Sequence, residues 1–501
     1  MKKTELLCQA LISGLGVFGS KPLANYIMAL ASNTVAHSAT EVTLSPLYHY
    51  QFSSFGKMIA EIVRLCTLDD GAVDISLFDR AIQAFIVKHY DELLLGVGPK
   101  RKVRVMLDVT PIKKPYSECL ADRGFVYCPN EIIAGNKSIT VGYGVSCLNY
   151  SFEKWSIPWS ILRCPPTQTY NEIGVEQLRA FAQRPHNERV LIVSSNDSGY
   201  GSVSFIAPLY PEKNLVTVTR LTNRNLYKQS VRTKTGGANG VYGACYALRT
   251  LDSESKRKDP KTKAIAPQKA SIFSLEADKI ETYNTFTTKK KKEITVELRL
   301  YKQMMLRSRG GHNMKDKPFD LVVVSLTDTK TGKKCFQRPM YLAVCGQQRD
   351  EIALREAYEE HYAHRYDIEP NNRFMKQQLL LEKFQTPNVA HNDVWLRIVQ
   401  LTEWLLLQAS DEVVAQPKKW QKSADKPADA SGRLSPAQTR RACETLFLTF
   451  DEKPFSPQIS NKGKGRKQGT VMPKKTKHPV VRKAKKAKKT DVAAAKMENT
   501  T

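Results

Sequence analysis

The sequence lacks the cysteine pattern of a zinc-binding or disulfide-rich protein. Its ten cysteines include no pair separated by two residues, and they form no metal-ligand spacing with the nine histidines. This pattern excludes the zinc-finger classes and a disulfide framework. Cysteines scattered in this way predict free, mostly buried thiols in a reducing compartment, so a cytoplasmic location is expected.

Long apolar stretches are also missing. No run of about 18 or more apolar residues occurs, so neither a transmembrane span nor a membrane partner is expected. Residues 1–19, MKKTELLCQALISGLGVFG, faintly resemble a secretory signal. Glu5 and Gln9 interrupt the apolar run and no convincing cleavage site follows closely, so an amphipathic first helix is the preferred interpretation.

Acidic residues are too few to balance the basic ones. Lys and Arg total 77 against 49 Asp and Glu, which gives a net charge of +28. Residues 461–490 hold 13 of these cations and no acid, so the rest of the chain is basic too. A surplus of this size favours a polyanionic partner. DNA is preferred over an anionic membrane because phosphates that are neutralised by a protein release condensed counterions.

The spacing of apolar residues and shifts in composition divide the chain into parts with different expected structures. The C-terminal part holds too few apolar residues to form a core of its own. The expected parts are, in order, a helical N-terminal region (1–98), the first part of an α/β core (99–211), an inserted β-rich subdomain (212–347), the second part of the core (348–410), a linker with a short helix (411–455) and a disordered basic tail (456–501).

Two short apolar segments are each typical of a buried strand, and each strand is expected to end in an aspartate. Residues 102–110, KVRVMLDVT, contain Asp108, and residues 189–197, RVLIVSSND, end at Asp197. A strand-end aspartate is most often a turn residue, and the sequence DSGYG that begins at Asp197 has turn chemistry of its own. Neither aspartate is informative alone.

A third carboxylate changes the interpretation. Glu369 lies on an expected helix far beyond Asp108 and Asp197. Two aspartates on neighbouring strands, with a glutamate laid against them by a helix, suit an α/β protein with a ribonuclease-H-like core. Three converging carboxylates repel one another unless a cation lies between them, and hard oxygen ligands suit Mg²⁺. The expected chemistry is phosphoryl transfer assisted by two metal ions.

Residues 362–376, YAHRYDIEPNNRFMK, surround this glutamate with cations at helical spacing. On one ideal helix, side chains at these offsets fall within about 80° of one another. The side chains concerned are those of Tyr362, Arg365, Glu369, Arg373 and Lys376. The alternative is a solvated helix face, on which each i,i+4 ion pair contributes only about 0.2 to 0.5 kcal/mol.

Pro370 interrupts this segment, because proline inside a helix removes a backbone hydrogen bond and costs about 3 kcal/mol. Either the helix kinks at Glu369, or a second helix begins there with Pro370 in its first turn, where proline is tolerated. In the second case the five side chains do not share one continuous helix face.

The same segment resembles the Y-x2-R-x3-E-x6-K signature of the bacterial insertion-sequence DDE transposases known by the letters YREK. All four positions and all three gaps match, at Tyr362, Arg365, Glu369 and Lys376. The resemblance extends to MLDVTPIKK around Asp108, to LIVSSNDSGYGS around Asp197 and to the β-rich insertion. It covers roughly residues 100–408.

The resemblance implies an enzyme that cuts transposon ends and joins the freed 3′ hydroxyls to target DNA. It implies a catalytic, metal-binding triad of Asp108, Asp197 and Glu369, which holds two Mg²⁺ ions for which Mn²⁺ can substitute. It also implies contacts to DNA phosphates from Tyr362, Arg365 and Lys376. Arg373 is added because it lies on the same helix face. Members of the family work as dimers on DNA, which implies a homodimer associated with the nucleoid.

Two other functions stay open. Pro370 departs from the family, in which a bulky residue is more usual after the glutamate, and such a departure is also expected of an inactive copy. The first alternative is therefore a catalytically inactive DNA-binding relative that acts as a regulator. The second is a Mg²⁺-dependent DNA nuclease without strand transfer.

Overall fold

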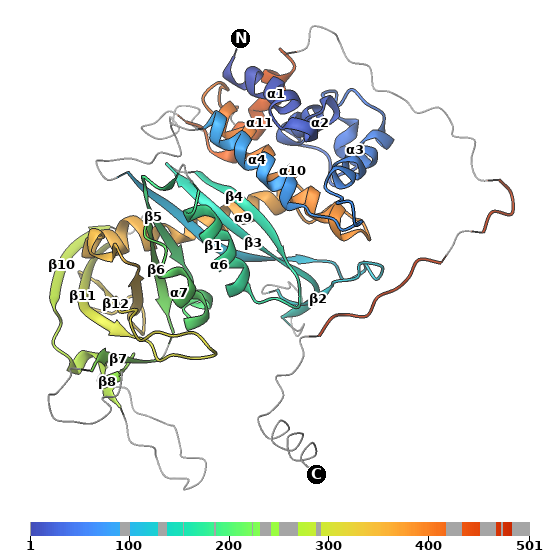
Figure 1. Cartoon of the computed structure of the whole chain (residues 1–501). Coiled ribbons are helices and arrows are strands. Elements are labelled where there is room, and N and C mark those ends of the chain that lie inside the picture. Colours follow the sequence, from blue (N-terminus) through green and yellow to red (C-terminus); the bar gives the residue numbers. More distant parts are fainter. Residues whose placement is uncertain are drawn as a thin grey trace, which may run out of the picture.

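A computed structural model of the chain shows a mixed α/β protein built on one large sheet (Figure 1). Helices from both ends of the chain gather beside this sheet. Among the described residues, no helix is long and apolar enough to cross a membrane. The described residues are 2–90, 101–128, 138–153, 155–184, 187–222, 224–230, 242–249, 269–286, 292–416, 433–450, 467–471 and 474–482.

The N-terminal region is helical over residues 2–90, as its apolar spacing predicts. Ser20 starts the second helix, because its side chain accepts a hydrogen bond from the Leu23 amide, and Pro22 occupies the first turn. All four N-terminal helices contact the long helix α10 (Val389–Ala409). The four are α1 (Lys3–Ser13), α2 (Lys21–Ser32), α3 (Phe52–Leu65) and α4 (Ser76–His89).

Five strands form the part of the sheet that carries the two aspartates. Their order is β4-β3-β1-β5-β6. Strand β3 is antiparallel to both β1 and β4, whereas β5 is parallel to both β1 and β6. The five strands are β1 (Lys102–Lys113), β3 (Ile139–Phe152), β4 (Trp155–Cys164), β5 (Leu191–Asn196) and β6 (Leu215–Leu221).

Helices cover both faces of this part of the sheet. Helix α6 (Tyr170–Ala182) begins at a capping box formed by Thr169 and Glu172. Gly174 lets α6 lie close to β1, because a Cβ at that position would stand 2.6 Å from Cδ2 of Leu107. Helix α7 (Val203–Leu209) packs against α6. Helices α9 (Ile368–Gln377) and α10 approach the sheet from the opposite face.

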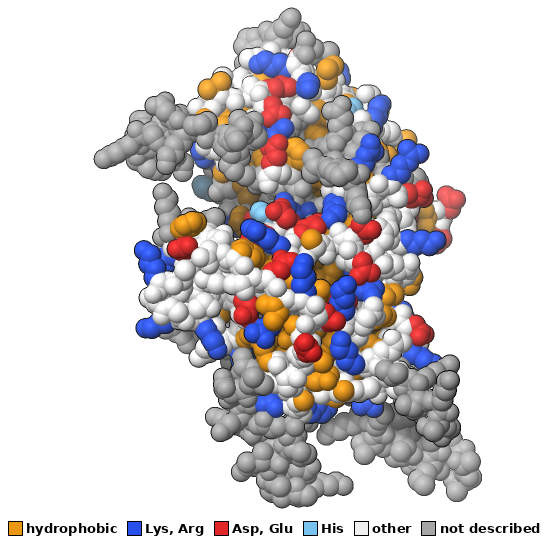
Figure 2. Space-filling view, turned by 90° about the vertical axis from the view of Figure 1, so that its left-hand side faces the viewer, with side chains coloured by type: hydrophobic (Ala, Val, Ile, Leu, Met, Phe, Trp, Pro, Cys, Tyr) orange, Lys and Arg blue, Asp and Glu red, His pale blue; other side chains and the backbone are white. Residues whose placement is uncertain are grey.

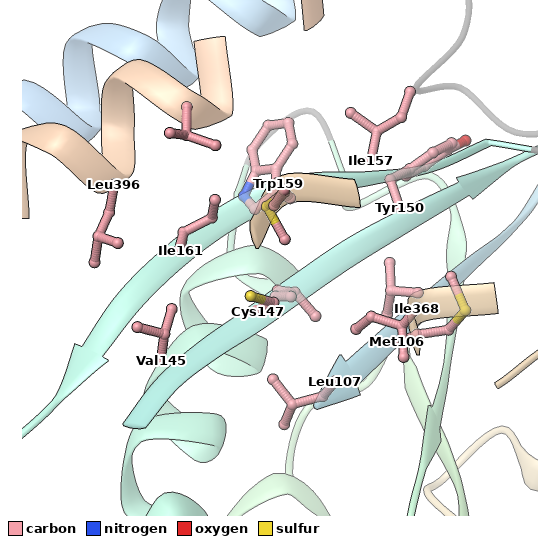
Figure 3. Packing of buried hydrophobic residues seen from close by; sticks show 14 of the residues in the cluster. Met106, Leu107, Val145, Cys147, Tyr150, Ile157, Trp159, Ile161, Ile368 and Leu396 are labelled. Atoms are coloured by element: carbon pink, nitrogen blue, oxygen red, sulfur yellow. The ribbon is translucent and has the colours of Figure 1, made fainter. Parts of the chain in front are cut away.

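Apolar side chains fill the space between the sheet and these helices. Figure 3 shows Ile161 of β4 turned toward Leu396 of α10, and Met106 of β1 beside Ile368 of α9. Trp395 and Trp404 of α10 are 1% and 0% exposed, which confirms that they belong to the core. A fully buried large side chain contributes about 1.5 to 3 kcal/mol, so α10 joins the N-terminal helices to the sheet through its apolar residues.

The inserted β-rich part extends the same sheet rather than forming a separate one. Its last strand pairs antiparallel with β6 through the register Ala343 to Thr219. The other strands follow outward from it, and the short β10 pairs with β11. The strands are β7 (Asn225–Gln229), β8 (Tyr242–Ala247), β9 (Ala270–Ser271), β10 (Lys279–Phe286), β11 (Glu293–Met305), β12 (Phe319–Asp328) and β13 (Met340–Cys345).

Residues 474–482, which lie in the tail that is expected to be disordered, form backbone hydrogen bonds with residues 118–123. The amide of Val481 donates a hydrogen bond to the Arg123 carbonyl over 2.7 Å, and the amide of His478 donates to the Glu118 carbonyl over 2.9 Å. The prediction considered only the apolar area that the tail can bury, whereas unpaired backbone groups beside a strand edge hold this segment. Apart from residues 467–471, the rest of 456–501 lies outside the described residues.

The short helix expected in the linker is α11 (Pro436–Phe447), which packs on α2 and α10. It begins with a capping box in which Ser435 and Gln438 take part. All ten cysteines are free thiols and seven of them are buried, which confirms that prediction.

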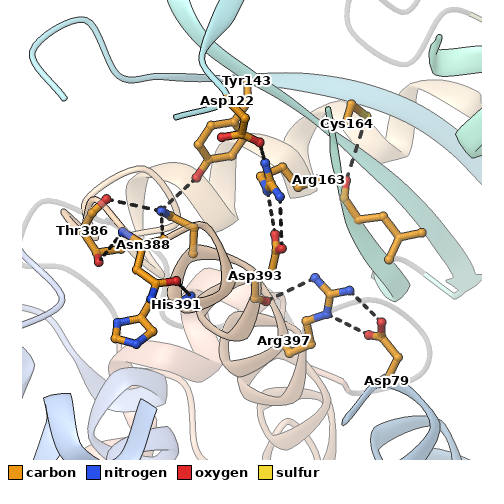
Figure 4. A network of polar contacts seen from close by, with 12 residues as sticks. Asp79, Asp122, Tyr143, Arg163, Cys164, Thr386, Asn388, His391, Asp393 and Arg397 are labelled. Atoms are coloured by element: carbon orange, nitrogen blue, oxygen red, sulfur yellow. Dashed lines mark hydrogen bonds and ion pairs between the residues drawn. The ribbon is translucent and has the colours of Figure 1, made fainter. Parts of the chain in front are cut away.

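A chain of charged side chains ties α10 to its surroundings (Figure 4). Arg163 of β4 forms ion pairs with Asp122 and with Asp393 of α10. One turn further along α10, Arg397 donates to Asp79 of α4 over 2.8 and 2.6 Å. Arg397 is only 4% exposed, so its charge depends on this carboxylate for compensation.

We predict that Asp79→Ala lowers the free energy of unfolding by about 3 to 5 kcal/mol, because it leaves the buried Arg397 guanidinium without its carboxylate. Chemical denaturation followed by circular dichroism measures the change. The double variant Asp79→Leu/Arg397→Met removes both charges and is expected to recover most of the lost stability. A single variant as stable as the parent protein would contradict this prediction.

Candidate active site

The register of two parallel strands brings Asp108 and Asp197 together. Strand β1 pairs with β5 through successive partners that end at Leu107 and Asn196. Asp108 and Asp197 are the next residues along the two segments, so they occupy adjacent positions where the parallel pairing of β1 with β5 stops. Both side chains line one pocket of about 480 Å³. The strand that was expected to end at Asp108 continues to Lys113 and pairs with β3 there, so only Asp197 follows the end of its strand.

The surroundings of Asp108 disfavour its charged form. The pKa of Asp108 is raised to about 6, mainly by burial and to a smaller extent by the neighbouring carboxylates of Glu369 and Asp197. The Val109 amide and the Arg365 guanidinium act in the opposite direction. A buried carboxylate gains when a cation binds between it and a neighbouring carboxylate, so the pair of Asp108 and Asp197 fits a hard divalent cation such as Mg²⁺.

Asn372 holds Asp108 from the side of the helix. Its Nδ2 atom donates a hydrogen bond to Oδ2 of Asp108 over 3.2 Å. Asn372 lies one helical turn after Glu369 and is 6% exposed. An amide donor on one carboxylate oxygen fixes the rotation of the group and leaves the other oxygen for a ligand. Asn372 is thus placed to orient Asp108.

The segment that carries Glu369 is helical but changes its winding three times. It begins with α8 (Leu354–Glu356), continues as a π-helical turn over Ala357–Tyr362 and a 3₁₀ turn over Ala363–Asp367, and ends in α9 (Ile368–Gln377). Pro370 is the third residue of α9 and lies in its first turn. The second of the two expected outcomes is therefore the one observed. π-helical turns occur frequently at functional sites.

The carboxylate of Glu369 is set apart from the two aspartates. Its side chain is 54% exposed, and Oε1 accepts a hydrogen bond from Nη2 of Arg365 over 3.2 Å. Among the residues that the structure describes, no three His, Cys, Asp or Glu side chains form a group that could hold a metal ion as they stand. The charge of Glu369 therefore still acts on Asp108, but its carboxylate forms an ion pair with Arg365.

Tyr362 and Arg365 lie inside the protein rather than on its surface. Tyr362 is 0% exposed, and burial raises the pKa of its hydroxyl to about 12. Its hydroxyl has no hydrogen-bond partner within the described part of the chain. The guanidinium of Arg365 is 5% exposed and stacks over the ring of Tyr366 at 4.1 Å. Both side chains therefore support the segment from within.

The two remaining cations of the segment differ. Nζ of Lys376 donates to the Pro111 carbonyl over 2.6 Å and lies 3.2 Å from Oε1 of Glu382. Lys376 thus links α9 to the end of β1, close to Asp108. Arg373 is exposed to solvent and is free to meet a ligand from outside. The five side chains do not form one stripe, because the winding changes before α9.

Three further residues beside the aspartates were not singled out from the sequence. Asn372 could have been found from its position one helical turn after Glu369. Arg220 and Arg338 line a second pocket, of about 450 Å³, that also includes Asp197. Arg220 belongs to β6, and Arg338 lies two residues before β13, so the pairing of these two strands brings them together.

No protein-family model matches this sequence, and no curated protein matches it either. The residues themselves, with their register, burial and charges, carry the functional interpretation that follows. The features of most weight are the adjacent positions of Asp108 and Asp197 and the elevated pKa of Asp108.

We predict that Asp108→Asn stabilises the protein near neutral pH. The pKa of Asp108 is about 6 in the folded chain against an ordinary 3.8, so the folded state binds this proton more tightly than the unfolded state. The stability that this proton supplies is present in acid and is lost as pH rises from about 4 to about 6. The neutral amide avoids that loss, which amounts to about 3 kcal/mol.

Thermal unfolding across this pH range measures the effect. The variant and the parent protein are expected to unfold at similar temperatures near pH 4, and the variant is expected to unfold at a higher temperature near pH 7. Equal melting temperatures at both pH values would show that Asp108 is not destabilised by its surroundings.

Proposed function

We propose that this protein is a DNA transposase with a ribonuclease-H-like core that cuts transposon ends and joins their 3′ hydroxyls to target DNA. The observation that carries the proposal is the adjacency of Asp108 and Asp197 on parallel strands. The strand order β4-β3-β1-β5-β6 supports it, because three antiparallel strands followed by two parallel ones are what a ribonuclease-H-like sheet requires. Helix α9 brings Glu369 to the same end of the sheet.

The residues that would hold divalent cations are Asp108, Asp197 and Glu369. The chemistry that two bound Mg²⁺ or Mn²⁺ ions supply is the activation of water or of a DNA 3′ hydroxyl and the stabilisation of the leaving oxygen. Asn372 orients Asp108 through its amide. Arg365 holds Glu369 by an ion pair, and Glu369 joins the aspartates when its carboxylate leaves that arginine.

The cations of the segment then have different tasks on DNA. Arg373 is exposed, so we assign it a direct contact with a DNA phosphate. Lys376 reaches a phosphate once its amine leaves Pro111 and Glu382. Arg365 and Tyr362 lie beneath this surface and position the helix that carries Glu369. A homodimer on DNA would present two such sites, one for each transposon end.

One observation favours the inactive DNA-binding regulator as a second candidate. Glu369 is paired with Arg365, and the described residues contain no ready group of three metal-binding side chains. In a relative that had lost catalysis, Glu369 would stay paired with Arg365 when DNA binds. A nuclease without strand transfer would use the same three carboxylates and differs only in its products.

The discriminating experiment supplies DNA that bears the element's own ends together with Mg²⁺ or Mn²⁺. Cleavage followed by joining is the expected result. Asp108→Ala should abolish both steps while leaving DNA affinity nearly unchanged, because it removes a cation ligand and no phosphate contact. Cleavage without joining would favour the nuclease, and binding alone would favour the regulator. Undiminished cleavage by Asp108→Ala would remove that residue from the catalytic triad.

The salt dependence of DNA affinity tests the phosphate contacts proposed for Arg373 and Lys376. Arg373→Ala and Lys376→Ala should each weaken binding and reduce the slope of log affinity against log salt by about 0.9, the value for one lost phosphate contact. Fluorescence anisotropy with a labelled DNA end at several salt concentrations measures this slope. Arg355→Ala, at an exposed arginine paired with Glu359, is the matched control and should leave the slope unchanged. A slope that does not respond in either test variant would exclude the phosphate role of that residue.

A further inference from the structure

Residues 474–482 of the basic tail, here called the docked segment, are held by the loop before β2 (Gly124–Tyr127). Its backbone forms a parallel bridge between Val481 and Gly124. Two of its amides donate to carbonyls of the loop, and Lys477 pairs with Glu118 at 2.5 Å. These contacts extend from Lys477 to Val481, so the docking consists of several contacts rather than one.

The buried Arg123 shows why the loop needs the docked segment. Arg123 is 4% exposed, and Nη2 donates to the His478 carbonyl over 3.2 Å. Its Nη1 atom has the Pro115 carbonyl at 3.3 Å as its nearest acceptor. A buried guanidinium without acceptors is costly, so the carbonyl that the docked segment supplies completes the surroundings of Arg123.

The docked segment lies beside the pocket of the two aspartates. Strand β2 and strand β4 pair along the same edge of β3. Val481 and Arg482 line a pocket of about 450 Å³ at this edge. That pocket and the aspartate pocket have residues in common, namely Val126, Gly144 and Tyr170. The two hollows are therefore neighbours along the sheet edge.

The docked segment stays outside the aspartate pocket and exposes cations beside it. Among the described residues, those that line the aspartate pocket include none of 474–482. Lys474, Lys475 and Arg482 are exposed. By contrast, the face on the side of β10 and β11 carries acidic and basic side chains interspersed (Figure 2). Arg482 lines the neighbouring pocket, and the docked segment itself contains no acidic residue, so this segment suits a polyanion rather than a plug for the aspartate pocket.

We propose that the docked segment is an anchored phosphate-binding ledge, which holds the backbone of DNA along the edge of β2 as it enters the aspartate pocket. This inference rests on the proposed function, since it assigns a DNA path to the proposed active site. Docking fixes the positions of three cations and so reduces the entropy that a free tail would lose on binding DNA. The tail therefore acts as part of the folded surface rather than as a loose arm.

A proline substitution that keeps every charge tests the anchoring. Val481→Pro removes the amide that donates to Arg123, so it is expected to release the docked segment. Val480→Pro is the matched control, because no hydrogen bond from the Val480 amide occurs among the described residues. Hydrogen exchange at the His478 amide measures docking without any DNA. Protection in the parent protein and in Val480→Pro, and its loss in Val481→Pro, are the expected results.

Binding to a short DNA duplex of arbitrary sequence then tests the ledge. Val481→Pro should lower affinity about tenfold at moderate salt and reduce the salt slope by about 2, whereas Val480→Pro should leave both unchanged. An unprotected His478 amide in the parent protein would overturn the docking. Released docking with unchanged affinity would overturn the ledge, and increased affinity would show instead that the docked segment obstructs DNA.

The hydrogen-exchange and duplex-binding results are separate from the test of the proposed function, because neither measurement requires cleavage. DNA binding that depends on Val481, in a protein that never cuts DNA, would sustain the ledge and reject the transposase. Cleavage and joining that proceed equally in Val481→Pro would reject the ledge and sustain the transposase. A parent protein that does not bind the duplex would overturn the ledge.

Discussion

The parallel pairing of β1 with β5 is the constraint on which the site depends. Parallel strands bring their C-terminal ends to the same edge of a sheet, and the register here stops one residue before each aspartate. Asp108 and Asp197 are therefore adjacent although 88 residues lie between them. A shift of one residue in either strand would turn one of the side chains to the opposite face of the sheet. The buried neighbours of both strands fix that register.

The rest of the fold compensates for a site that is unfavourable by itself. Burying the Asp108 carboxylate costs free energy, and the nearby carboxylates of Glu369 and Asp197 add a smaller repulsion, so the pKa of Asp108 is raised. Helix α10 supplies the opposing stability, because its apolar side chains pack on the sheet and on the N-terminal helices. The ion pairs of Arg163 with Asp393 and of Arg397 with Asp79 fix the position of this helix. Arg365 offsets part of the negative charge at the site itself.

Much of the secondary structure follows from local patterns in the sequence. The Val-rich strands around Asp108 and Asp197, the helix after Thr169 and the N-terminal helices were all predictable, because apolar spacing and capping residues act locally. Pro370 also acted locally, since proline is accepted in the first turn of α9 and not in a helix interior. The burial of Tyr362 was not predictable. It depends on the π-helical turn, which determines which side chains of the segment face the sheet.

Contacts between distant segments were the features that the sequence did not reveal. Asn372 meets Asp108 only after α9 has packed against β1, and composition alone gave no sign that residues 474–482 would find backbone partners at 118–124. The pairing of Glu369 with Arg365 was predictable as an i,i+4 ion pair. Its consequence, that the glutamate stands apart from the aspartates, needed the three-dimensional position of both groups.

The most direct test of the central claim is anomalous diffraction from crystals of the protein soaked in Mn²⁺. The claim is that Asp108 and Asp197 share a divalent cation because β1 and β5 place them side by side. A manganese peak between the two carboxylates is predicted, with Mn–O distances of about 2.0 to 2.3 Å as expected for a hard divalent ion. Manganese bound only elsewhere, or no peak between these aspartates at saturating Mn²⁺, would contradict it.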